Sequence, residues 1–136
     1  MQLRRTKWGG IADDGLRGSG FFRTAERNGV VWLVDPDGGR FLSKGVNTVR
    51  FDQDRIGHTD RVPYAETCRV KYGSLQIWRT AAANRLASWN FNTLGCWSDE
   101  LVAGAGSQRL ASAPTAELGA SFRLHRRDQI FPDVFD

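Results

Sequence analysis

The sequence predicts an α/β fold in which a parallel sheet follows a β-meander. The first observation is a helix-like stretch that runs directly into a short, apolar, β-prone stretch at residues 92–97. A helix leading through a tight turn into a buried strand is half of a βαβ unit. The second observation is a series of strands before residue 52, separated by strong turn signals. Together they predict one α/β domain.

Residues 1–19 are rich in glycine and charge without periodicity, and they predict a flexible lead-in to a domain over residues 20–136. The sequence Asn28-Gly29 separates two β-prone stretches, 21–27 and 30–34, and is typical of a type I′ hairpin turn. A Pro- and Gly-containing turn at 35–39 then leads to a long third strand over residues 40–51.

The helix is expected over residues 75–89, where apolar residues recur every three or four positions, at Leu75, Trp78, Ala82, Leu86 and Trp89. Ser74 is placed to cap its start, and Asn90 can adopt the left-handed conformation that ends it. Phe91 should then pack back on the helix.

The remaining stretches carry weaker signals. Residues 52–73 predict a long polar connection, and residues 101–120 a polar stretch with a short helix around 107–111. A last strand is expected at residues 120–125. We predict that residues 40–49, 92–97 and 120–125 are parallel neighbours in one sheet, in that order.

Composition restricts the function classes. The length of 136 residues and 40% hydrophobic content suit one globular domain, and no apolar run is long enough to span a membrane. The first residues lack the apolar segment of a signal peptide, so a cytoplasmic location is the default, or secretion if the N-terminus is incomplete. The sequence has only two cysteines and two histidines, and the histidines lie far apart, so we expect no metal site. It contains no nucleotide-binding motif, so we expect no cofactor. The net charge of +4 comes from scattered arginines, which argues against a nucleic-acid interface.

Three stretches resemble the β-agarase-like glycoside hydrolases, (β/α)8-barrel enzymes that cut galactose-containing algal polysaccharides. The first is Gly20-Phe21-Phe22 followed by Val31-Trp32-Leu33-Val34-Asp35-Pro36-Asp37-Gly38 and Phe41-Leu42-Ser43-Lys44-Gly45-Val46-Asn47. The second is Leu86-Ala87-Ser88-Trp89-Asn90-Phe91-Asn92-Thr93-Leu94-Gly95-Cys96-Trp97-Ser98, and the third is Phe131-Pro132-Asp133-Val134-Phe135-Asp136. They occur in the family's order. Asn90 stands where the family often has Gly, and Cys96 where it often has Asn.

The resemblance implies the N-terminal part of a (β/α)8 barrel, apparently truncated, because a whole barrel takes about 250 residues. It also implies hydrolysis of O-glycosidic bonds by two carboxylates. In related barrels these follow later strands, so no catalytic residue is expected in this chain. The acidic pair Asp99-Glu100 suits a helix start better than catalysis.

Sugar binding is the role expected of the residues that are present. Sugars offer apolar C–H faces and hydroxyls, which aromatic rings and short polar side chains recognise. We predict substrate contacts from Asn47, Trp97, Ser98 and Asp99, near the ends of predicted strands. Two alternatives stay open: a small carbohydrate-binding module without catalysis, and a basic nucleic-acid-binding domain. The expected partner is a polysaccharide or oligosaccharide.

Overall fold

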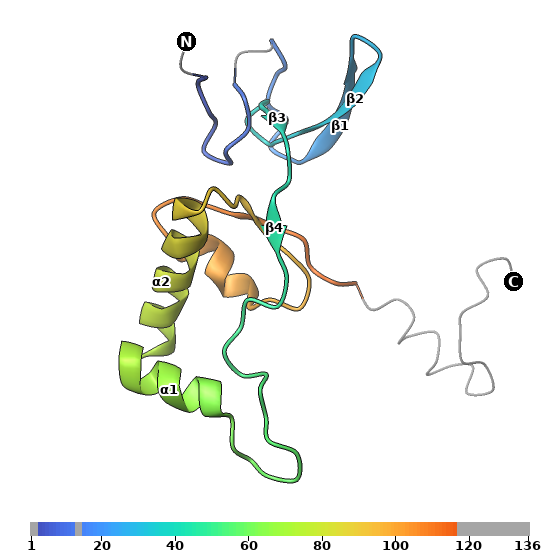
Figure 1. Ribbon diagram of the computed structural model, residues 1–136. Helices are drawn as coiled ribbons and strands as arrows, with labels where there is room; N and C mark the ends of the chain where they lie inside the picture. The colour runs from blue at the N-terminus through green and yellow to red at the C-terminus, as the bar shows by residue number, and fades with distance from the viewer. Residues whose placement is uncertain (1–2, 13–14, 117–136) are drawn as a thin grey trace, which may run out of the picture.

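The computed structural model describes residues 3–12 and 15–116, which contain two sheets. The first is antiparallel, with strand order β1-β2-β3, and the second is parallel, with order β4-β5-β6. Its three strands do not close into a barrel. Helices α1, α2 and the 3₁₀-helix η1 accompany the second sheet (Figure 1). The elements are β1 (Arg23–Arg27), β2 (Val30–Val34), β3 (Arg40–Phe41), β4 (Gly45–Val46), α1 (Pro63–Tyr72), α2 (Leu75–Ser88), β5 (Thr93–Leu94), η1 (Glu100–Gly104) and β6 (Ala111–Ser112).

The predicted hairpin is present. β1 and β2 pair antiparallel, and Arg27 faces Val30 across a two-residue turn. Asn28 and Gly29 both have positive φ values, 53° and 74°, as a type I′ turn requires. The backbone conformation of these two turn residues therefore determines how β1 and β2 pair.

The turn after β2 is organised by Asp35, a fully buried carboxylate. One of its oxygens accepts from the backbone N–H groups of Asp37, at 3.0 Å, and Gly39, at 2.9 Å. The other accepts from the hydroxyl of Thr6. Gly10 packs so close to this carboxylate that a Cβ there would lie 2.3 Å from it.

The N-terminal segment consequently lies against the first sheet. Ile11 forms antiparallel bridges with both Arg5 and Arg40. The predicted division between a flexible lead-in, 1–19, and a domain, 20–136, stays a prediction, but residues 3–12 make regular backbone contacts with β3.

The prediction of a single long strand over residues 40–51 was wrong. β3 pairs antiparallel with β2, whereas β4 pairs parallel with β5 in the other sheet. Residues 42–44 lie between them, with Leu42 70% exposed. The apolar pattern was real, but it serves two different sheets, and sequence periodicity does not reveal which partner a strand has.

The parallel pairing of β4 with β5 is as predicted, with Val46 opposite Leu94. The third strand of this sheet is β6, which was not expected, and the predicted strand at 120–125 lies outside the described residues. The short helix expected around 107–111 was also wrong. The 3₁₀-helix lies earlier, at Glu100–Gly104, where Asp99 caps it through the N–H of Leu101.

Residues 52–73 are less irregular than predicted, because they contain α1. This helix begins at Pro63, a residue that suits a first helical position. Only Ala65 and Cys68 of α1 are buried, so the helix has too few buried positions to give a clear apolar period.

Helix α2 and the core match the prediction more closely. The hydroxyl of Ser74 caps α2 by accepting from the N–H of Ile77, and Asn90 has a φ of 62° after its end. The core lies between the helices and the parallel sheet and includes Cys68, Trp78, Ala83, Leu86, Leu94, Val102 and Leu110. Phe91 packs against it as expected. Trp89 does not, since it is 62% exposed. None of the helices within the described residues is long and apolar enough to cross a membrane.

Candidate functional site

The carboxyl edge of the parallel sheet brings two loops together. Val46 and Leu94 pack into the core with the helices. Because side chains alternate along a strand, Asn47 and Gly95, the next residues, are directed to the opposite face. They are also neighbours, since the N–H of Gly95 donates to the carbonyl of Val46 at 2.8 Å.

Asn47 is exposed and its side-chain amide lies directly over Gly95. A Cβ at position 95 would lie 2.0 Å from Oδ1 of Asn47. Only glycine at position 95 leaves this space free. The amide, which offers both donors and an acceptor, is therefore presented at the end of the strands.

Trp97 is the exposed aromatic residue of the second loop. It is 59% exposed, and its φ of 58° is uncommon for so bulky a residue. A hollow of about 140 Å³ beside it is also lined by Ser98, Glu100, Ser112 and Thr115. The geometry offers a flat ring beside short polar side chains.

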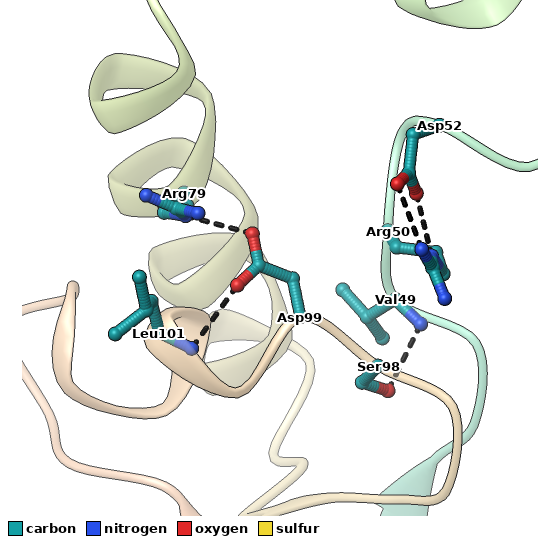
Figure 2. A network of polar contacts seen from close by, with 7 residues as sticks. All are labelled: Val49, Arg50, Asp52, Arg79, Ser98, Asp99 and Leu101. Atoms are coloured by element: carbon teal, nitrogen blue, oxygen red, sulfur yellow. Dashed lines mark hydrogen bonds and ion pairs between the residues drawn. The ribbon is translucent and has the colours of Figure 1, made fainter.

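Ser98 and Asp99 have partners within the protein (Figure 2). The N–H of Val49 donates to Oγ of Ser98 at 3.0 Å, and the N–H of Asp99 donates to the carbonyl of Val49 at 3.0 Å. The carboxylate of Asp99 accepts from Nε of Arg79 at 2.7 Å and from the N–H of Leu101 at 3.1 Å. These contacts join the two loops to each other and to α2.

A second ion pair borders the same edge. Nε and an Nη of Arg50 donate to the two carboxylate oxygens of Asp52, at 2.5 and 2.7 Å. This hydrogen-bonded pairing holds the pKa of Asp52 below its ordinary value. Arg50, Asp52, Arg79 and Asp99 line a hollow of about 280 Å³. Within residues 3–12 and 15–116, no cluster of three or more His, Cys, Asp or Glu residues could hold a metal ion.

All four predicted site residues thus lie at or just beyond the carboxyl edge of β4 and β5. The structure pairs Asn47 with Gly95, and it places Ser98 and Asp99 in the contacts that join the loops. Their contact with substrate stays a prediction. Sequence reasoning missed Arg79, which reaches this edge from α2. Its position one helical turn after Leu75 was the available signal, because both then lie on the same side of the helix.

Comparison with known proteins identifies the class to which this chain is similar. No family model matches the sequence. In solved structures, the fold matches proteins described as agarases or named with GH50: the crystal structure of BpGH50 (TM-score 0.67, 21% identity, covering 90% of this chain and 26% of that one) and that of an agarase, AgWH50C (TM-score 0.61, 24% identity, covering 82% and 23%). A third is an exo-beta-agarase (TM-score 0.62, 19% identity, covering 81% and 26%).

Sequence comparison finds a relative, Beta-agarase B from Vibrio sp. (strain JT0107). It is 25% identical over 155 aligned positions, which cover 71% of this chain and 16% of that protein. These matches confirm the resemblance to β-agarase-like glycoside hydrolases that the sequence motifs indicated. The chain spans about one sixth of the relative and about a quarter of the solved structures.

Proposed function

We propose that this chain forms the N-terminal part of a barrel-type glycoside hydrolase acting on agar-type, galactose-containing polysaccharide. The observation that carries the proposal is that a chain similar to an agarase presents an exposed Trp97 and an exposed Asn47 at the carboxyl edge of a parallel sheet. In (β/α)8 enzymes, the active site is built at this end of the strands.

The two side chains suit complementary parts of a sugar. The indole of Trp97 can cover the apolar C–H face of a galactose ring, with its exposed face available in the second loop. The amide of Asn47 can both donate to and accept from hydroxyls. Gly95 supports this role, because a residue without a side chain leaves room for the amide of Asn47.

Hydrolysis requires two further groups. A retaining glycosidase holds its two carboxyl groups about 5–5.5 Å apart, and an inverting one about 6.5–9.5 Å apart. We propose that both lie in a part of the enzyme outside this chain, which corresponds to only 16% of Beta-agarase B. The acidic group nearest to Trp97 in sequence, Asp99, is occupied as a helix cap and as the partner of Arg79.

Ligand-detected NMR with a tetrasaccharide prepared from agarose tests the binding part of the proposal. We expect saturation transfer to the tetrasaccharide and none to maltotetraose. Trp97→Ala should abolish the transfer. Trp89→Ala is the matched control, because Trp89 is equally exposed, at 62%, but follows the C-terminal end of α2.

A reducing-end assay on agarose, porphyran and carrageenan tests the catalytic part. We expect no turnover by the purified chain. Agarose hydrolysis that is lost in Glu100→Gln would place a catalytic carboxylate within this chain and contradict the proposal. Equal loss of binding in Trp97→Ala and Trp89→Ala would show that the carboxyl edge is not the site.

A further inference from the structure

The loop that carries Trp97 has a backbone conformation that its surroundings must maintain. Trp97 has a φ of 58°, in the left-handed region. For residues other than glycine this conformation is sterically unfavourable, because Cβ comes close to the following carbonyl oxygen. Such a conformation persists only where neighbouring contacts hold it. At 59% exposure, the packing of the indole itself supplies only part of that support.

The support comes from the two residues that follow. The hydroxyl of Ser98 accepts from the N–H of Val49 in the neighbouring loop, as Figure 2 shows. The backbone N–H of Asp99 donates to the carbonyl of the same Val49. Asp99 then makes two side-chain contacts, one to the first turn of η1 and one to Nε of Arg79 on α2. The side chains of Arg79 and Asp99 are only 17% and 19% exposed, so water screens their pairing less than it screens a surface ion pair.

We infer that Asp99 is a positioning residue for the sugar-binding Trp97, acting through Arg79, and that it does not itself contact the sugar. The inference rests on the proposed function and gives Asp99 a different role from the direct contact that the sequence predicted. Both oxygens of its carboxylate already accept hydrogen bonds from the protein. Arg79 anchors the loop to the longest helix of the described chain, so the indole is held before any sugar arrives. Holding a binding group in place beforehand lowers the entropy cost of binding.

A double-mutant cycle in the full chain tests this role. Asp99→Asn keeps a residue that can cap η1 but loses the ion pair with Arg79. Arg79→Gln removes the same pair from the other side. We expect either change to weaken binding of the agarose tetrasaccharide about tenfold and the double variant to weaken it no further. Arg79→Lys, which keeps the charge, should restore part of the affinity.

The indole N–H resonance of Trp97 provides a readout that does not depend on sugar binding. It is assigned by its disappearance in Trp97→Phe, and we expect both Asp99→Asn and Arg79→Gln to shift it. Asp60→Asn is the matched control, because it breaks the exposed ion pair with Arg55 and should leave the resonance unchanged.

Two results would overturn the inference. One is an unshifted indole resonance in Asp99→Asn. The other is an additive loss of affinity in the double variant, which would mean that Asp99 contacts the sugar directly. If the unchanged chain binds no tetrasaccharide, the proposed function fails, while the indole resonance still decides whether Asp99 positions Trp97. Arg79→Lys serves the same purpose if Asp99→Asn does not fold.

Discussion

Replacing Gly95 with alanine should separate sugar binding from stability. The added Cβ would lie 2.0 Å from Oδ1 of Asn47 and 3.1 Å from both Cγ of Asn47 and the carbonyl oxygen of Val46. The overlap with Oδ1 is too severe to persist, so the amide must rotate away. Because Asn47 is exposed, its side chain has room to do so.

The expected free-energy change is small because two effects oppose each other. Forcing Asn47 off its preferred rotamer costs about 0.5–1.5 kcal/mol. The φ of Gly95 is outside the left-handed region, so alanine fits its backbone and stabilises by about 0.4–1 kcal/mol through the unfolded state. Gly95→Ala should therefore change the free energy of unfolding by less than about 1 kcal/mol.

Binding should respond more strongly than stability. Moving the amide removes a hydrogen bond to the sugar, worth about 0.5–1.5 kcal/mol, and lowers the affinity by about twofold to somewhat more than tenfold. Urea unfolding followed by circular dichroism and NMR titration with the agarose tetrasaccharide measure the two quantities. In an Asn47→Ala background the obstruction is gone, so Gly95→Ala should then stabilise the chain and leave binding unchanged.

Two outcomes would refute this reasoning. A destabilisation above about 2 kcal/mol would mean that the contact with the carbonyl of Val46, and not the amide of Asn47, limits the space at position 95. Unchanged affinity in Gly95→Ala, together with weakened affinity in Asn47→Ala, would mean that the amide need not lie over Gly95 to bind sugar.

Three further changes test the scaffold. Asp35→Ala should destabilise the first sheet by about 3 kcal/mol, because it leaves buried N–H donors without an acceptor, and trypsin should then cleave the N-terminal segment faster than in Asp35→Asn. Ser74→Ala should cost about 1 kcal/mol of unfolding free energy through the lost cap of α2, seen as a lower urea midpoint, whereas Ser74→Asp should not. The hydrogen bond from Arg61 lowers the pKa of Glu66, so this pair contributes stability above the ordinary carboxyl pKa and loses it as pH falls through the lowered pKa. Urea midpoints at pH 7 and pH 3 should therefore differ less in Glu66→Gln, and an equal difference would show that the pair does not contribute.

The sequence predicted the features that local chemistry decides. Asn28-Gly29 specifies a hairpin turn wherever it lies, and Ser74 caps a helix through a donor three residues away. The parallel pairing of β4 with β5 could also be predicted, because parallel neighbouring strands are joined by a long crossover connection that is usually helical. Asn47 and Trp97 could be proposed as site residues for the same reason, since both follow strands directly.

Features that depend on distant partners could not be predicted. The stretch 40–51 has one apolar pattern but contributes to two sheets, which only the positions of β2 and β5 decide. Helix α1 has few buried residues and gives little periodic signal. The pairing of Asp99 with Arg79 joins residues 20 positions apart across a turn and a strand, and the apolar pattern that located α2 says nothing about its polar contacts.

The electrostatics of the carboxyl edge favour recognition over acid catalysis. A general acid in a glycosidase needs a pKa raised toward neutrality, usually by an apolar environment. Asp52 lies at this edge with its pKa lowered instead, because Arg50 donates two hydrogen bonds to it. The carboxylate of Asp99 accepts a hydrogen bond from Nε of Arg79 at 2.7 Å and caps η1. Both side chains are therefore engaged in contacts that hold the loops, which agrees with the proposal that the acid for glycosidic cleavage lies in another part of a complete enzyme.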